Sequence, residues 1–250
     1  SRGLGDVYKR QVIASSTYPL DIYPAYKIAK HYHAKLIYEV HDLWPLSPME
    51  LGGYSKNHPF IRIMQKAEDD CYRYADAVVS MLPKAEEHMR EHGLTKGKFH
   101  YVPNGIVLSD WNNPRGIPEG HGLLLSKLQK EGKLIVGFAG AHGIANSLYA
   151  VIDAVSSLTE QNVVLVLVGG GQEKENLIRY THKKGIANVY FLPPINKLAI
   201  PNLLKEMDVL YIGLQKQSLF RFGISPNKMF DYMMAAKPII QAIDLSLIHI

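Results

Sequence analysis

Residues 223–240 read G-I-S-P-N-K-M-F-D-Y-M-M-A-A-K-P-I-I, a polar helix start followed by an apolar strand. Ser225 can cap a helix, and Pro226 suits the first helical turn because the N–H that proline lacks would have no partner there. Asn227 and Lys228 then fall in a turn whose free N–H groups and positive dipole end attract anions. A lysine by itself is unfavourable at this end of the dipole, so we expect an anion to bind here. An ordinary αβ unit with a surface lysine is the alternative that these residues leave open.

The rest of this stretch completes a helix and starts a strand. Asp231 lies one helical turn beyond Asn227, on nearly the same face of the predicted helix. The helix ends before Lys237 and Pro238, and the apolar pair 239–240 begins a buried strand. The stretch therefore predicts one helix–strand unit.

The whole chain alternates short apolar runs with longer amphipathic segments. The runs that predict strands are 12–14, 36–40, 77–81, 99–102, 134–138, 163–168, 189–192, 209–212 and 238–241. The segments that predict helices are 22–32, 60–74, 83–91, 148–158, 173–184, 197–207 and the one from residue 225. Strict alternation predicts an α/β fold of parallel sheets with helices on both faces.

A change of texture separates two such series. Residues 110–132 are rich in Gly, Pro and Asn and read as a connector with one short helix. We therefore expect two Rossmann-like domains, 12–109 and 133–244, with their parallel sheets facing a cleft.

The two ends of the chain look foreign to this pattern. Residues 1–11 (S-R-G-L-G-D-V-Y-K-R-Q) and 245–250 (L-S-L-I-H-I) resemble translated sequencing-adaptor read-through, and we expect both to be non-native. The first segment contributes a net +2 to the formal charge of +5, which leaves about +3 for the remainder. A balance this mild does not indicate nucleic-acid binding.

Composition narrows the class of protein further. With 47% hydrophobic residues among 250, the chain can bury one or two cores. Cys71 is the only cysteine, so no disulfide framework is expected, a reducing compartment fits, and a packed thiol is favoured over a nucleophile. No stretch approaches 18 consecutive apolar residues, so the sequence predicts no membrane span.

Three loops of the second series are candidates for ligand binding, because ligands gather at the carboxyl ends of parallel strands. Gly140 and Gly143, after the strand at 134–138, would let the backbone approach a phosphate. Gly170, after the strand at 163–168, would do the same. Neither the dinucleotide nor the P-loop fingerprint is present, and permissive turns are the alternative explanation.

The third loop carries Pro194 and Ile195 after the strand at 189–192, a stiff wall whose backbone could bracket a nucleobase. A plain rigid turn is the alternative. In the first series, His41 and Asp42 follow the strand at 36–40 and could contact a sugar or a phosphate, or lock the loop by bonding to each other. Trp44 adds an apolar face of the kind on which sugars stack.

Other constellations carry no chemistry that we recognise. Glu68, Asp69 and Asp70 are most simply a solvated helix face. The histidines share no metal-ligand spacing with cysteines and form no H-E-x-x-H motif, so no metal site is expected. No nucleophile elbow is present.

The order of these motifs is more specific than any one of them, and it resembles the family 4 retaining glycosyltransferases of GT-B fold. The resemblance is closest to the bacterial enzymes that build capsule, O-antigen and exopolysaccharide. It runs from about residue 12 to 243 and is carried by E-V-H-D-L-W-P (39–45), V-P-N-G-I (102–106), V-G-F-A-G (136–140), V-G-G-G-Q-E (168–173), S-P-N-K-M-F-D-Y-M (225–233) and A-A-K-P-I-I (235–240).

The resemblance implies a nucleotide-sugar donor, expected to be UDP-linked, on the second domain and an acceptor on the first. The loop from Gly140 to Gly143 and the helix start from Ser225 to Lys228, with Asn227, would flank the diphosphate. Lys228 would stabilise charge on the leaving group. Asp231 would hold the ribose hydroxyls.

The remaining implied contacts come from other loops. Pro194 and Ile195 would lie near the base, with Gly170 also on the donor side. His41 would lie near the transferred sugar, with Asp42 and Trp44 on the acceptor side. Transfer would retain configuration without a metal or other cofactor.

The chain departs from the family pattern in three places. Gly223 stands where the first acid of the E-x7-E motif is usual, and His142 and Asn146 stand where Arg and Lys are usual. Arg221 is a candidate substitute for the missing charge. The first strand and Gly-rich loop of the N-terminal domain and the last C-terminal helices are also absent, so we expect an active parent and an inactive fragment.

The function expected from this resemblance is sugar transfer to a lipid-linked or polysaccharide acceptor in bacterial surface polysaccharide biosynthesis. We expect a cytoplasmic protein with peripheral contact to the inner face of the membrane. A sugar-nucleotide 2-epimerase of the same fold and a non-catalytic nucleotide-sugar-binding protein are the alternatives. Gly223 keeps the last of these open.

Overall fold

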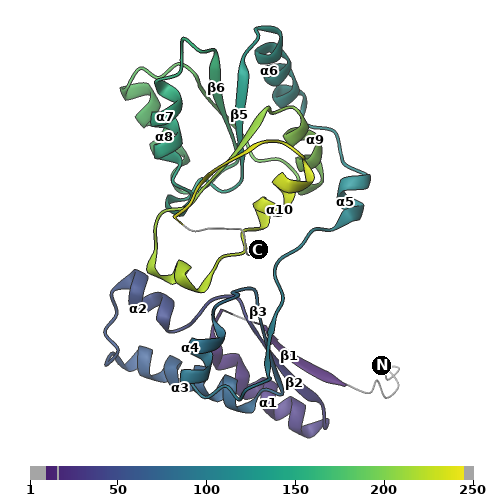
Figure 1. The fold of residues 1–250 in the computed structure, drawn as a ribbon, viewed down its shortest axis with the longest axis vertical. Helices are drawn as coiled ribbons and strands as arrows, with labels where there is room; N and C mark the ends of the chain where they lie inside the picture. The colour runs from purple at the N-terminus through teal and green to yellow at the C-terminus, as the bar shows by residue number, and fades with distance from the viewer. Residues whose placement is uncertain (1–9, 16, 245–250) are drawn as a thin grey trace, which may run out of the picture. The chain divides into compact units, whose positions relative to one another are not determined.

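The computed structural model describes residues 10–15 and 17–244, and it divides them into two compact units (Figure 1). The first unit comprises the residues up to 104 together with 217–225, and the second comprises 105–216 and 226–244. The adaptor-like segments that we predicted lie outside the described residues, except for Arg10 and Gln11. Gln11 is the first residue of a strand, so regular structure begins one residue before the predicted domain boundary.

The first unit is a four-stranded parallel sheet with helices. Its strands follow the order β1 (Gln11–Ser15), β2 (Lys35–Val40), β3 (Ala77–Ser80) and β4 (Phe99–Tyr101). Its helices are α1 (Ile22–His31), α2 (Leu46–Gly52), α3 (Pro59–Tyr74) and α4 (Glu86–Glu91). The helix α2 was not predicted, and α4 begins three residues later than the proline at 83 suggested.

The core of this unit contains the alternate, buried side chains of its strands and the buried faces of its helices. In β2 every second residue is buried, and these side chains pack with one face of α3 that includes Cys71 and Tyr72. Cys71 is fully buried, which fits the expected packed thiol. The prediction of a solvated acidic face on α3 was wrong: Glu68 is 1% exposed and Asp70 is 2% exposed. Asp70 accepts a hydrogen bond from the Tyr23 hydroxyl, and Nε2 of His88 on the next helix lies 3.3 Å from Glu68, so periodicity within α3 alone could not indicate this burial.

The second unit is a five-stranded parallel sheet in the order β7-β6-β5-β8-β9. Its strands are β5 (Leu134–Ala139), β6 (Val163–Val168), β7 (Val189–Leu192), β8 (Val209–Gly213) and β9 (Ile239–Ala242). Its helices are α5 (Leu108–Asn112), α6 (Glu119–Lys130), α7 (Leu148–Ser156), α8 (Lys174–Lys183), α9 (Ile200–Lys205) and α10 (Asn227–Met234). In Figure 1, α7 and α8 lie to one side of this sheet, and α6 and α9 lie to the other.

The central strands β5 and β6 are buried on both faces, which explains their continuous apolar sequence. The α/β architecture of parallel sheets with helices is therefore confirmed. The segment 110–132 holds more structure than a connector, because α6 spans 12 residues and buries Leu125 and Leu128.

Residues 217–225 belong to the first unit, although the sequence placed them inside the second domain. The short 3-10 helix Ser218–Phe222 is held there by Arg221, which pairs with Glu50 at 2.6 Å. The backbone N–H of Lys84 also donates to the carbonyl of Phe222 at 3.0 Å. The chain therefore enters the first unit a second time before α10 begins.

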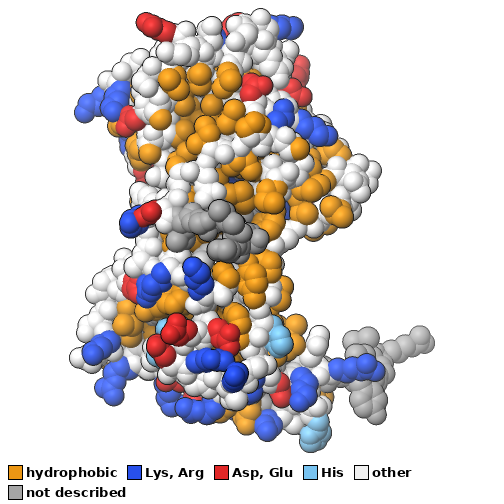
Figure 2. Space-filling model, viewed as in Figure 1, with side chains coloured by type: hydrophobic (Ala, Val, Ile, Leu, Met, Phe, Trp, Pro, Cys, Tyr) orange, Lys and Arg blue, Asp and Glu red, His pale blue; other side chains and the backbone are white. Residues whose placement is uncertain are grey.

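The hydropathy of the helices and the charges on the surface bear on possible partners. Among the described residues, no helix is both long and apolar enough to cross a bilayer. On the face shown in Figure 2, Lys and Arg side chains are interspersed with Asp and Glu side chains.

Candidate functional site

The helix α10 begins at Asn227, two residues later than predicted, and Ser225 does not cap it. Pro226 occupies the N-cap position and offers no side-chain hydrogen bond to the helix. The Ser225 hydroxyl instead accepts a hydrogen bond from the backbone N–H of Asn104 at 3.0 Å. This hydrogen bond joins the two most specific motifs of the sequence, since Asn104 belongs to V-P-N-G and Ser225 to S-P-N-K. Both residues lie in the first unit.

Lys228 lies in the first turn of α10 as a half-buried cation. Its Nζ donates to Oδ1 of Asn146 at 2.6 Å and lies 4.7 Å from the ring centre of Phe138. Burial lowers the pKa of Lys228 to about 8, since little water remains to solvate the ammonium group. Among the described residues no carboxylate forms an ion pair with it. This is the electrostatic setting in which a bound anion is most favourable, because it would restore the lost solvation.

The Lys228 side chain packs directly on Gly140. A Cβ atom at Gly140 would lie 3.2 Å from Cε of Lys228, and the φ of this glycine is +154°. Glycine thus admits the lysine stem beside the end of β5, where the first turn of α10 also presents N–H groups that have no partner within the helix. The predicted pairing of the Gly140 loop with the start of α10 is present in the second unit.

A cavity of about 350 Å³ adjoins these loops. It is lined by Gly140, Ala141, Val168, Gly169, Gly170, Pro194, Ile195 and Ile200. Four of the predicted donor-side residues, from three separate loops, therefore share one cavity, as expected at the carboxyl ends of neighbouring parallel strands. Gly143 is not among the lining residues and instead precedes the 3-10 helix Ile144–Asn146.

The second loop contains three glycines, at 169–171, and the surroundings of their Cβ positions differ. A Cβ at Gly169 would lie 1.9 Å from the carbonyl oxygen of Gly140, and one at Gly171 would lie 2.6 Å from the carbonyl oxygen of His142. Both positions allow the two loops to pack backbone to backbone. At Gly170 the nearest atoms are those of Pro194, 4.0 Å away, so this glycine is the one that leaves open space.

A second, smaller cavity of about 100 Å³ surrounds Asp231. Lys197, Asn227, Asp110 and Trp111 are among the residues that line it. The indole N–H of Trp111 donates to Oδ1 of Asp231 at 3.4 Å. Burial raises the pKa of Asp231, and the Trp111 bond and the charge of Lys197 act in the opposite direction. Lys197 and Trp111 were missed by the sequence analysis, because only the tertiary fold brings α5 and the 197 loop to α10.

The two residues that stand in place of the usual basic pair carry no charge to this site. His142 is fully buried, and neither ring nitrogen has a hydrogen-bond partner. Burial first, and then the charge of Lys174, lowers the pKa of His142 to about 4, so the imidazole is neutral at pH 7. Asn146 serves by holding the Lys228 ammonium group. Arg221, the candidate substitute, is paired with Glu50 in the first unit.

The acceptor-side candidates lie at the end of β2 in the first unit. Nε2 of His41 lies 3.0 Å from the Ser15 hydroxyl and 3.5 Å from Glu39, while burial raises the pKa of Asp42 and the charge of His41 acts in the opposite direction. Trp44 packs edge-on against two aromatic rings, those of Tyr18 at 4.8 Å and Phe60 at 6.3 Å.

Gly223 has no room for a side chain. Its backbone adopts φ +95° and ψ 175°, a region used almost only by glycine. A Cβ here would lie 2.5 Å from Cδ of Pro83. The acid that the family pattern places at this position is therefore excluded by the local fold of the first unit.

Each half of the chain matches a glycosyltransferase family model. Residues 6–110 match the model for Glycosyltransferase Family 4, and residues 125–241 match the model for Glycosyl transferases group 1. Two curated proteins are similar in sequence. "Putative teichuronic acid biosynthesis glycosyltransferase TuaH" of Bacillus subtilis (strain 168) is 25% identical over 218 residues, which cover 82% of this chain and 50% of that protein. "Putative colanic acid biosynthesis glycosyl transferase WcaI" of Escherichia coli (strain K12) is 27% identical over 103 residues, 41% of this chain and 25% of that protein.

The chain thus spans at most half the length of these curated relatives. Among solved structures, Anabaena Alr3699/HepE in complex with UDP-glucose superposes with a TM-score of 0.63 at 17% identity, over 92% of this chain and 59% of that one. WaaG, a glycosyltransferase involved in lipopolysaccharide biosynthesis, superposes with a TM-score of 0.61 at 16% identity, over 92% of this chain and 66% of that one. At such identities the likeness shows the fold alone.

Proposed function

We propose that this chain, whose two halves each match a glycosyltransferase model, is a glycosyltransferase of GT-B fold that moves a sugar from a nucleoside diphosphate sugar to a saccharide acceptor. The observation that carries this proposal is Lys228, a half-buried cation without a carboxylate partner among the described residues, beside Gly140 at the start of α10. The cavity that begins at Gly140 has the volume and the open backbone that a nucleoside diphosphate requires.

The donor would extend from Lys228 across the carboxyl edge of the second sheet. Its diphosphate would bind the Lys228 ammonium group and the N–H groups of α10, with the backbone at Gly140 close by. Asn227 would add its backbone N–H. The base would lie against Pro194 and Ile195, beside Gly170. Anabaena HepE, which shares this fold, was solved with UDP-glucose and with UDP, and we propose a UDP-linked donor here.

Asp231 would accept hydrogen bonds from the ribose hydroxyls. Its carboxylate lines a small cavity with Asn227 and Lys197, and the Trp111 N–H fixes one oxygen. The remaining oxygen and lone pairs can accept from hydroxyl donors. The raised pKa of Asp231 reflects its partial burial, and hydroxyl donors would favour the ionised form.

The chemistry that we propose depends on charge stabilisation. When the bond between the sugar and the diphosphate breaks, negative charge develops on the leaving phosphate, and Lys228 would stabilise it. Since His142 is neutral, the lysine and the N–H groups of α10 would bear this load. We propose transfer with retention of configuration, without a metal or other cofactor, and with His41, Asp42 and Trp44 on the acceptor side.

We further propose that the acceptor is a lipid-linked saccharide or polysaccharide and that the pathway builds a bacterial surface polysaccharide. The names of the two curated relatives, which refer to teichuronic acid and colanic acid, support this pathway class. Catalysis would take place at the cytoplasmic face of the membrane through peripheral contact. Ser225 and Gly143 are proposed as loop supports of the donor site and not as direct charge contacts.

Donor binding tests this proposal on the chain as it is. Titration calorimetry with UDP should show binding, and Lys228→Ala should weaken it by roughly tenfold or more, since a charge-assisted bond to phosphate is lost. Lys183→Ala, which changes an exposed lysine on α8, is the matched control and should leave binding unchanged. Equal affinity in all three proteins would remove Lys228 from the site.

Turnover separates the reaction classes. Nucleotide release with a panel of UDP-, GDP- and TDP-sugars that depends on an acceptor lipid supports transfer, and Lys228→Ala should then reduce turnover by at least roughly tenfold. Interconversion of the donor without any acceptor would instead indicate an epimerase. Binding of nucleotide sugars with neither reaction would indicate a non-catalytic binding protein.

A further inference from the structure

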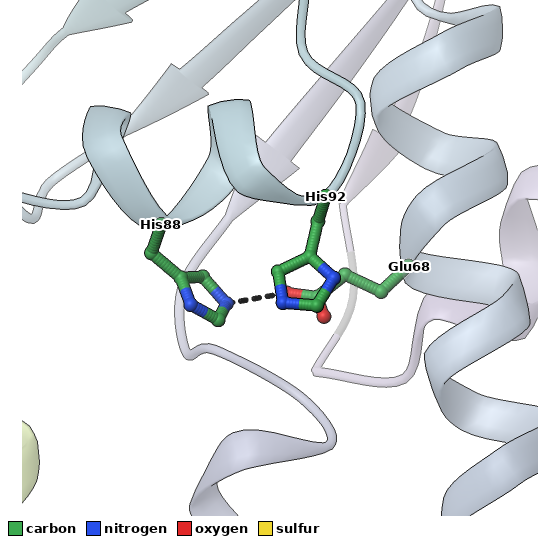
Figure 3. Close-up of side chains that lie close together, drawn as sticks. All are labelled: Glu68, His88 and His92. Atoms are coloured by element: carbon green, nitrogen blue, oxygen red, sulfur yellow. Dashed lines mark hydrogen bonds and ion pairs between the residues drawn. The ribbon is translucent and has the colours of Figure 1, made fainter.

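We propose that Glu68 of α3 and His88 and His92 of α4 form a binding site for one divalent transition-metal ion in the first unit. The three side chains come from two neighbouring helices and converge (Figure 3). One possible ligand atom from each lies within 4.8 Å of the others. None of these residues belongs to the proposed donor site, which lies in the second unit.

The spacing of the ligands suits such an ion. His88 and His92 are four residues apart on α4, which places both rings on one face of the helix, with ring centres 4.6 Å apart. Nε2 of His88 lies 3.3 Å from Oε1 of Glu68. Ligands about 2.0–2.1 Å from a tetrahedral zinc ion stand about 3.3 Å apart, so small rotations of these side chains would bring them into place.

The hydrogen bonds around Gln65 leave one close contact unsatisfied, that between Nε2 of Gln65 and Nδ1 of His92. Nε2 of Gln65 lies 2.8 Å from Oε2 of Glu68, 2.9 Å from Oδ1 of Asp69 and 2.8 Å from Nδ1 of His92. An amide nitrogen has two hydrogens and cannot serve three acceptors. If Nδ1 of His92 instead donates to Asp69, which lies 3.0 Å away, it presents a proton to another donor. A metal ion bound to His92 would use an unprotonated ring nitrogen as its ligand, and Gln65 would then donate to Glu68 and Asp69 alone.

The burial and the charge of Glu68 also favour a bound cation. Glu68 is 1% exposed, and among the described residues neither Lys nor Arg forms an ion pair with it. Its one possible cationic partner among those residues is His88, and a buried carboxylate is costly unless its charge is compensated. The Tyr72 hydroxyl donates to its Oε1 at 2.8 Å and so orients the carboxylate, as outer partners of metal ligands do. Two neutral imidazoles and a carboxylate are ligands that zinc, cobalt and nickel accept.

A path for the ion is also present. His88 lines a cavity of about 400 Å³ together with Glu87 and Glu91 of the same helix, and Lys84 and Arg221 also line it. The side chain of His92 is 28% exposed, so the site can be reached from solvent. The ion would tie α3 to α4, and we infer a structural role for it because no proposed reacting group is placed nearby.

Cobalt and zinc test this proposal on the tag-free chain. Co²⁺ added to the metal-free protein should give one equivalent of bound ion with visible absorption bands, which Zn²⁺ should displace. His88→Gln and His92→Gln should each weaken binding by at least tenfold. His100→Gln, which changes an exposed histidine of the same unit, is the matched control and should bind as the parent does.

Stability gives a second measurement that does not depend on colour. Zn²⁺ should raise the unfolding temperature of the parent and of His100→Gln, and EDTA should reverse the rise. Circular dichroism shows whether the two test variants are folded before titration. If either test variant is folded and binds as tightly as the parent, or if the parent binds no stoichiometric ion, the cluster is an ion pair of His88 with Glu68 and the proposal fails.

Discussion

Gly223→Ala should destabilise the first unit by an amount that the structure allows us to calculate. The backbone at Gly223 lies in a region that costs other residues about 1–3 kcal/mol. The added Cβ would also lie 2.5 Å from Cδ and 2.6 Å from Cγ of Pro83, and overpacking of this kind costs about 1–3 kcal/mol. The sum is about 2–6 kcal/mol, a large fraction of the stability of a typical domain.

Gly97→Ala is the matched control for this change. Gly97 also has a positive φ, +86°, but no atom lies within 4 Å of its Cβ position. It should therefore lose about 1–2 kcal/mol from backbone conformation alone. The difference between the two variants therefore measures the contact with Pro83 together with the larger backbone strain at Gly223.

Urea unfolding followed by tryptophan fluorescence measures both variants. The sequence has two tryptophans, of which Trp44 lies in the first unit and Trp111 in the second. In a Trp111→Phe background, emission from Trp44 reports on the first unit. With a slope of about 2 kcal/mol per M, the midpoint for Gly223→Ala should fall by about 1–3 M. Equal midpoints for the two alanine variants would refute the contact and reopen position 223 to an acidic side chain.

Three further outcomes are expected from the same geometry. UDP affinity measured by calorimetry should fall as pH rises through about 8, because Lys228 loses its charge there, and Lys228→Met should abolish this dependence. Asp231→Asn should weaken UDP binding by about tenfold to a hundredfold, whereas Asp110→Asn in the same cavity should change it little; equal effects would contradict the ribose contact. Ser225→Ala should cost about 1–3 kcal/mol in urea unfolding by leaving the Asn104 N–H without its acceptor, and an unchanged midpoint would show that this bond is dispensable.

The sequence predicted the architecture well where local patterns decide it. Continuous apolar runs such as those of β5 and β6 occur because these strands are buried on both faces, and this burial is a property of all central parallel strands. The positions of Gly140, Gly170 and Pro194 at strand ends followed from the same alternation, and the structure places all three on one cavity. Periodicity predicts the type and the approximate ends of each helix and strand because these depend mainly on the residues within that element.

Other expectations failed where distant residues decide the outcome. Ser225 has the composition of a helix cap, but its hydroxyl bonds to Asn104, which precedes it by 121 residues. The acidic run on α3 reads as solvated, but Asp70 accepts a hydrogen bond from Tyr23 and Glu68 is buried beside His88 of the next helix. A hydrogen bond or a burial that depends on a partner so far along the chain leaves no local pattern.

The sequence alone thus determined that parallel sheets alternate with helices and that a lysine begins the last helix after a glycine-rich series of loops. Only the tertiary structure decided the charge state of this region, because a pKa depends on which groups surround a side chain. In the folded chain His142 is fully buried, and its imidazole is therefore neutral. Lys228 is half-buried beside Gly140, and its ammonium group donates to Asn146. The tertiary structure also placed Pro83 against Gly223, which turned a missing acid in the sequence into a position where no side chain fits.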